Sequence, residues 1–126
     1  MSLKKLFEEV LYQYRTHRYE IGATLHKNDT GIPVNVWIDD MTWKNSGHWK
    51  RMKFQPDTGD RSDIRKFIPM SIEDEPKILV KKKTSLSSRE IEMIKEFVRL
   101  NKSILLQYGD QEISIGQFMK KMKKLN

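Results

Sequence analysis

The sequence predicts an α+β fold: an N-terminal helix, an antiparallel sheet of about four to five strands, and two to three C-terminal helices. Three observations predict it. Apolar residues recur at helical spacing near both ends of the chain, they alternate with polar residues over residues 19–54, and turn-forming residues separate the alternating stretches. Strands that are grouped together, with helices grouped after them, are typical of α+β folds with an antiparallel sheet.

The N-terminal helix is expected over residues 2–16, where Ser2 can cap the first turn. Its apolar side is broad and consists of Leu3, Leu6, Phe7, Val10, Leu11 and Tyr14. An amphipathic helix must bury such a side, so packing on the sheet of the same chain is the default, and docking on a second copy is the alternative.

Three strands are expected over residues 19–26, 33–38 and 48–55, with a turn at 27–31. In the second strand, Val34, Val36 and Ile38 alternate with Asn35, Trp37 and Asp39. In the third strand, Met52 and Phe54 share one face, and Trp49, Arg51 and Lys53 share the other. We expect Asp39 and Asp40 to end the second strand, because aspartate is a favoured turn residue.

Two further strands are predicted beyond the loop at residues 55–63. Residues 64–70 are expected to form a short edge strand, since Pro69 cannot donate to a neighbouring strand. Residues 76–83 form the other, and the basic run Lys81–Lys83 at its end can guard an edge against aggregation.

The C-terminal helices are predicted from two capping boxes, Ser87-x-x-Glu90 and Ser114-x-x-Gln117. The first opens an apolar stripe of Ile91, Ile94, Phe97, Val98, Leu105 and Leu106. Asn101 can break this stretch into two helices. The second opens a helix whose expected buried side is Ile115, Phe118, Met119, Met122 and Leu125.

The length of 126 residues predicts a single domain, 1–126, that can bury a core without disulfides. The absence of cysteine excludes thiolate metal sites and is consistent with a cytoplasmic location. No apolar run approaches membrane-spanning length, and the first residues do not form a signal peptide, so we expect no membrane partner.

Positive charge is segregated along a chain whose net charge is +7. Residues 41–56, 77–89 and 119–126 carry four, five and four Lys/Arg and no acid, whereas the remainder has 11 Lys/Arg against all 17 acids. If these stretches converge in space, they create a positive field that favours polyanions.

The segment WKNSGHWKRMKF (43–54) joins aromatic to basic residues, as a nucleic-acid surface requires for base stacking and phosphate contacts. The candidate binding residues are Trp37, Lys44, Trp49, Lys50, Arg51, Lys53, Lys81, Lys82 and Lys83. The ordinary alternative is that a helix covers the tryptophans and that Lys/Arg stems pack along their rings.

His48 is the candidate catalytic residue, because neighbouring cations favour its neutral form, which can act as a base in metal-independent RNA cleavage. The other histidines, His17 and His26, have no spacing that places them beside it. No HxH, HxxxH or HExxH pattern is present, and neither are the Walker A, GxGxxG and GxSxG motifs. We therefore expect no metal and no cofactor.

Two stretches, GIPVNVWIDD followed by a histidine and KRMKF, and NKSILLQYGDQEISIGQFMKKMKKL, resemble small uncharacterised bacterial proteins with a P-x-x-V-W-(I/L)-D strand and a final helix. The resemblance covers about residues 31–54 and 90–125 and implies no activity, although some such proteins occur in mobile-element or toxin–antitoxin settings.

Together these observations favour a non-enzymatic, cytoplasmic bacterial protein that binds nucleic acid through a basic-aromatic sheet face. A protein-interaction or homodimer module is the second hypothesis, and a metal-independent ribonuclease centred on His48 is the third.

Overall fold

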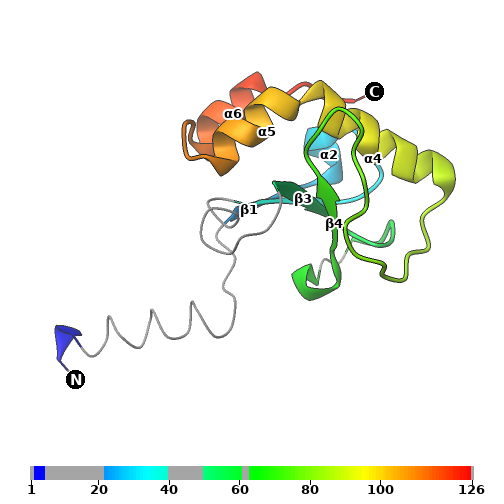
Figure 1. Cartoon of the computed structure of the whole chain (residues 1–126), viewed down its shortest axis with the longest axis horizontal. Coiled ribbons are helices and arrows are strands. Elements are labelled where there is room, and N and C mark those ends of the chain that lie inside the picture. The colour runs from blue at the N-terminus through cyan, green and yellow to red at the C-terminus, as the bar shows by residue number, and fades with distance from the viewer. Residues whose placement is uncertain (1, 5–21, 40–49, 61–62, 126) are drawn as a thin grey trace.

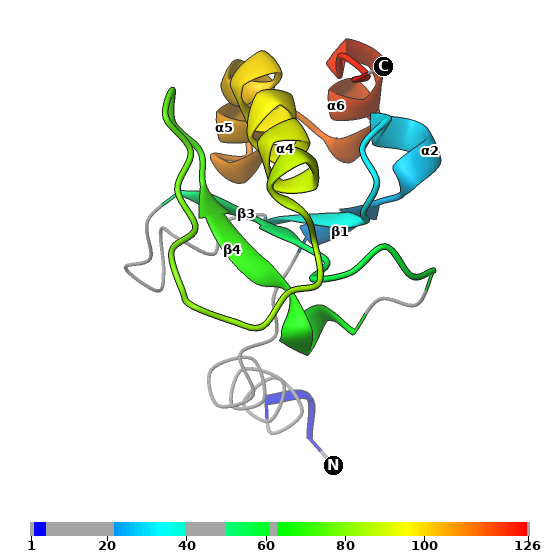
Figure 2. The same ribbon diagram turned by 90° about the vertical axis from the view of Figure 1, so that its right-hand side faces the viewer.

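The computed structural model describes residues 2–4, 22–39, 50–60 and 63–125. Four strands form one antiparallel sheet whose order follows the chain, β1-β2-β3-β4. Their bounds are Gly22–Leu25, Val36–Asp39, Arg51–Phe54 and Ile68–Ser71. The helices α4 (Ser88–Leu100), α5 (Lys102–Gly109) and α6 (Ile115–Lys121) lie together over one face of this sheet, as Figures 1 and 2 show.

The predicted α+β class is thus confirmed as a helix layer on an antiparallel sheet. The predicted N-terminal helix gains no support, because only residues 2–4 of its range are among the described residues. The helices that close the chain number three in its described part, at the upper end of the prediction.

Alternation along each strand sets the two faces of the sheet. The register places Ile38 opposite Met52 and Met52 opposite Met70, and it places Val36 opposite Phe54 and Phe54 opposite Ile68. These side chains are at most 2% exposed and pack on the helices. Their partners in the helix layer are Ile94, Phe97, Val98, Leu105, Tyr108 and Phe118.

Both capping boxes are present in the helix layer. At α4, the Ser87 hydroxyl accepts from the Glu90 N–H at 3.1 Å, and the Glu90 carboxylate accepts from the Ser87 N–H at 2.9 Å. At α6, Ser114 and Gln117 make the same reciprocal pair at 3.1 and 2.8 Å. Each pair satisfies two amide groups that the first helical turn leaves without partners.

Asn101 separates α4 from α5, as the sequence predicts, and it also holds the C-terminal segment. This residue is 2% exposed. Its side-chain amide donates to the carbonyls of Phe97 at 3.1 Å and Lys123 at 2.9 Å, and its carbonyl oxygen accepts from the Lys123 N–H at 2.7 Å. The side chain therefore ties the helix break to residues 122–125, which run extended beyond α6.

The last helix differs from its prediction. It ends at Lys121 instead of reaching residue 125, because the following residues turn to the extended conformation at Met122 and bind Asn101. Of the expected buried side, Phe118 is fully buried, but Ile115 and Met119 are 40% and 37% exposed.

The C-terminal segment also contacts α2 (Lys27–Thr30), a single helical turn in the stretch predicted as a turn. The Leu125 N–H donates to the Thr30 carbonyl at 2.8 Å. Gly31 ends α2 with φ at +76°, and a Cβ added there would lie 1.6 Å from the Leu125 carbonyl oxygen. Glycine is therefore needed at this position both for its left-handed backbone and for the close approach of the tail.

The region between β4 and α4 differs most from its prediction. Residues 64–66 form a short 3₁₀ helix, η1, and Pro69 lies inside β4. The predicted strand over residues 76–83 is reduced to one bridge, Ile78 opposite Met70. The Pro69 carbonyl accepts from the Leu79 N–H, so the backbone nitrogen of Pro69 also faces this sparsely paired side of β4. Proline is tolerated here because its lack of an N–H costs no hydrogen bond to β3.

The loop after β3 is organised by Gln55, which is 1% exposed. Its side-chain amide donates to the Asp57 carboxylate at 2.9 Å and to the Gly59 carbonyl at 2.6 Å. The Gly59 N–H donates to the same carboxylate at 2.8 Å. These bonds lower the pKa of Asp57 below its ordinary value, and the bond from Gln55 has the largest effect.

Candidate functional site

Trp37 and Lys53 form a cross-strand pair on the sheet face opposite α4–α6. They are direct partners in the register of β2 and β3, and both are half-buried. The predicted hairpin is therefore present, and it brings Trp37, Arg51 and Lys53 to one face, as the alternation of the two strands requires. An indole ring beside a lysine is the arrangement expected of a base-stacking and phosphate-binding surface.

Asp39 lies beside this pair and was not among the predicted site residues. Its carboxylate is 0% exposed and accepts from the Trp37 Nε1–H at 2.8 Å and from the Arg51 Nε–H at 3.4 Å. Asp39 is the last residue of β2, at the same parity as Trp37, and it faces the sheet surface. The sequence does place Asp39 two residues after Trp37, on the same face of the strand. We instead expected Asp39 to end the strand, because aspartate favours turns.

The Asp39 contacts change the role that Arg51 can have. Its side chain is 12% exposed and forms an ion pair with the buried carboxylate of Asp39. Arg51 is therefore engaged in an ion pair with Asp39, and Asp39 in turn accepts the hydrogen bond of the Trp37 indole N–H. The two residues position the aromatic member of the face.

Two of the other predicted binding residues, Lys50 and Lys82, have partners within the chain. The Lys50 ammonium lies 3.4 Å from the Asp110 carboxylate, which ties β3 to the end of α5. Lys82 donates to the carbonyls of Phe67 at 3.0 Å and Arg65 at 3.4 Å, next to η1. Lys81 and Lys83 are exposed and have no ion pair with any residue that the structure describes.

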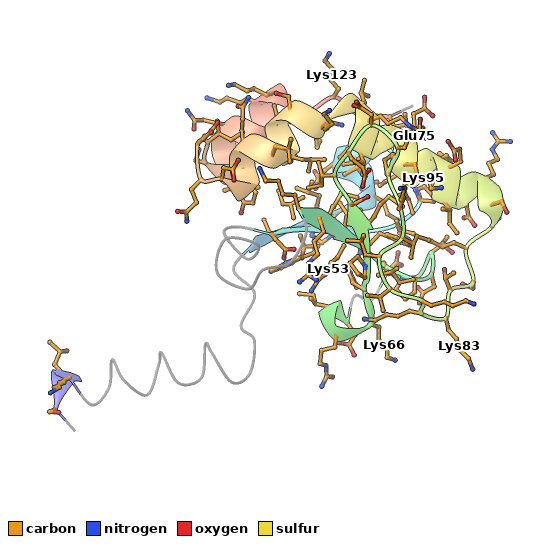
Figure 3. All side chains as sticks on the ribbon, viewed as in Figure 1. Lys53, Lys66, Glu75, Lys83, Lys95 and Lys123 are labelled. Atoms are coloured by element: carbon orange, nitrogen blue, oxygen red, sulfur yellow. The ribbon has the colours of Figure 1, made fainter. Side chains whose placement is uncertain are left out.

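The 3₁₀ helix η1 adds Lys66 to the side of the sheet that carries Lys53. Lys66 lies three residues before Pro69, the partner of Lys53 across β3 and β4. In Figure 3, Lys53, Lys66 and Lys83 lie on the side away from the helices, whereas Lys95 and Lys123 lie with the helices. Sequence reasoning missed Lys66 because it assigned this residue to an edge strand and did not place that strand's start beside Lys53.

Arg65, the neighbour of Lys66, is paired with an acid. Its guanidinium lies 3.1 Å from the Asp63 carboxylate. The hydrogen bond between the two side chains is the main cause of a raised pKa for Arg65 and a lowered pKa for Asp63. Lys66 is thus the cation of η1 that has no ion pair within the described ranges.

Three predicted residues, Lys44, His48 and Trp49, lie outside the described residues. His26 is exposed, and its backbone N–H donates to Asp29 at 3.0 Å in a capping box for α2. Within residues 2–4, 22–39, 50–60 and 63–125, no cluster of histidine and acidic side chains could hold a metal ion. No helix of this part of the chain is long and apolar enough to cross a bilayer.

No family model, curated protein or solved structure matches the chain. The function is therefore inferred from the geometry of the sheet face.

Proposed function

We propose that the chain binds nucleic acid on the sheet face opposite α4–α6, with Trp37 and Lys53 at the centre of the contact. The observation that carries this proposal is their direct cross-strand pairing, which holds a ring and a cation side by side on two neighbouring strands. A base stacks on an aromatic ring regardless of its identity, and a cation beside it meets the phosphate of the same nucleotide.

The surrounding residues support this division of roles. The Asp39 carboxylate holds the indole N–H of Trp37 at 2.8 Å, so the ring is oriented before a base arrives. Lys66 extends the basic surface to the segment that precedes β4. Arg51 acts through Asp39, so its replacement would disturb Trp37 and would not isolate a phosphate contact.

The test compares two double variants with the same change in net charge. Lys53→Ala/Lys66→Ala removes the proposed phosphate contacts, and Lys120→Ala/Lys121→Ala removes two exposed lysines of α6 on the helix side. Binding of fluorescent single-stranded and double-stranded DNA and RNA is followed by anisotropy across a salt series. The readout is the slope of log K against log [salt], which falls in magnitude by about 0.7–0.9 for each lost phosphate contact.

Single-stranded nucleic acid should bind the wild type in the micromolar range or tighter at low salt. The slope should fall by about 1.4–1.8 in the Lys53/Lys66 variant and stay unchanged in the α6 variant. Equal slopes in the two variants would contradict the proposed face, and absence of binding at low salt would exclude the function. Loss of RNA signal over time in EDTA, abolished by His48→Ala, would favour the ribonuclease hypothesis instead.

A further inference from the structure

The free edge of the sheet is a second surface without an assigned role. Residues 77–79 lie along β4 on the side away from β3, and the Ser71 N–H bonds the Lys77 carbonyl while the Leu79 N–H bonds the Pro69 carbonyl, both at 2.9 Å. Successive residues of a strand direct their amides to opposite sides. The N–H and C=O of Ile78 therefore point outward, and they bond no residue in the described part of the chain.

This edge is also apolar. Ile78, Leu79 and Val80 are consecutive and are 40%, 41% and 47% exposed. An exposed edge with a run of apolar side chains is a template for pairing with another strand, and proteins normally cover or block such an edge. Figure 2 shows this segment at the margin of the sheet, beside β4 and apart from the helix layer.

The charges on either side of the edge identify the partner. Three acids, Glu73-Asp74-Glu75, precede it and three bases, Lys81-Lys82-Lys83, follow it. Ile78 is the midpoint of these two runs. When two copies of the segment pair antiparallel with Ile78 opposite Ile78, the acids of each copy lie beside the bases of the other.

Individual contacts favour the same register. Lys81 would lie near Glu75 and Lys83 near Glu73 of the second copy, and none of these four side chains has an ion pair within the described ranges. The middle residues of the two charged runs, Asp74 and Lys82, already have partners within the chain. Asp74 binds Lys102 at 2.7 Å, and Lys82 binds the carbonyls beside η1.

Registers shifted by two residues place like charges opposite each other and are therefore less favourable. Because Ile78 directs its amide outward and its neighbours Lys77 and Leu79 bond β4, a shift of the register by one residue would lose the Ile78 bonds, so we compare shifts of two residues. Pairing Ile78 with Val80 would place Lys81 opposite Lys77, and pairing Ile78 with Pro76 would place Lys77 opposite Lys77. Like charges directly opposite each other destabilise a strand pair.

We propose that a second copy of this chain docks antiparallel on this edge, with Ile78 opposite Ile78. The two sheets are thereby joined through the bonds that the two Ile78 residues exchange. This is β-strand addition between identical edges, an isologous contact of twofold symmetry. The contact is short, so the dimer forms and dissociates with concentration.

The test is sedimentation velocity over a concentration series with two charge-reversed variants. Lys81→Glu/Lys83→Glu and Glu73→Lys/Glu75→Lys each convert four ion pairs of the dimer into like-charge pairs. Each should weaken self-association about tenfold or more. An equimolar mixture of the two variants restores opposite charges and should associate about as well as the wild type.

Two controls accompany the reversals. Lys120→Glu/Lys121→Glu makes the same charge change on α6 and should leave the dimer intact. Ile78→Pro removes the outward N–H and leaves in place the chain's own backbone bonds, which use residues 77 and 79. It should give a monomer with an unchanged circular dichroism melting curve. A wild type that is monomeric up to millimolar concentration would overturn the proposal. Weakening by the lysine reversal alone, without rescue in the mixture, would also overturn it and would indicate an acidic peptide as the partner.

Discussion

Replacement of Asn101 by alanine tests whether one buried side chain fixes the C-terminal segment. The change removes three hydrogen bonds, of 3.1, 2.9 and 2.7 Å, at a residue that is 2% exposed. A hydrogen bond contributes about 1 kcal/mol, and a partner left buried without one costs at least as much. The Phe97 carbonyl keeps its bond from the Asn101 backbone N–H, and Lys123 is exposed enough for water to replace part of the loss. We therefore expect the free energy of unfolding to fall by about 2–3 kcal/mol.

Two measurements check this expectation. Urea denaturation gives the free energy of unfolding, and hydrogen exchange of the Lys123 amide reports the bond to the Asn101 carbonyl oxygen directly. In the wild type this amide should be protected, and in the variant it should exchange as freely as an exposed amide. A loss below about 0.5 kcal/mol, or continued protection of the Lys123 amide, would refute the inference that Asn101 holds the tail. Gln107→Ala, which removes an exposed bond to Ser103, is the control and should have little effect.

Three further predictions concern single positions. Gly31→Ala should destabilise the protein by about 2 kcal/mol or more in urea denaturation, since it combines a left-handed backbone with a collision against Leu125. Gly116→Ala in α6, where a Cβ would make only an ordinary contact with the Ser114 hydroxyl at 3.8 Å, should instead stabilise the protein by about 0.5–1 kcal/mol. Equal effects of the two changes would contradict the role of the tail. Ser87→Ala should cost about 1 kcal/mol by thermal denaturation, whereas Ser88→Ala, one residue into α4, should be nearly neutral. Gln55→Leu should return the pKa of Asp57 toward its ordinary value in an NMR titration, because the Gln55 bond is the main cause of its lowering. A group with a lowered pKa contributes stability above its unfolded-state pKa, and this stability is lost as pH falls through the folded-state pKa. An unchanged Asp57 titration in the variant would contradict the role of Gln55.

Local patterns in the sequence predicted much of this fold. Alternation over β2 and β3 gave the correct faces for Trp37 and Lys53, and the two capping boxes began α4 and α6 at the expected serines. These features depend on residues that are close in the sequence. The hairpin register then follows from burying one face of each strand.

Features that depend on distant residues were not predictable. The end of α6 is set by Asn101, about twenty positions earlier, and helical periodicity carries no information on that contact. The strand expected over residues 76–83 is limited to a single bridge, and Lys82 reaches the carbonyls beside η1 with its side chain. Asp39 was expected at a turn, but Trp37 and Arg51 hold its carboxylate on the sheet.

The contact between Leu125 and Thr30 has a consequence for the order in which the chain folds. Each strand of the sheet pairs with its neighbour along the chain, so the sheet can form early from contacts of short sequence separation. The bond from the Leu125 N–H to the Thr30 carbonyl joins residues that are far apart in the sequence. During synthesis, α2 therefore leaves the ribosome long before its partner does, and Gly31 stays without its contact to Leu125 until that residue has also emerged. Closure of this contact is expected to be a late step in folding, after the sheet has formed.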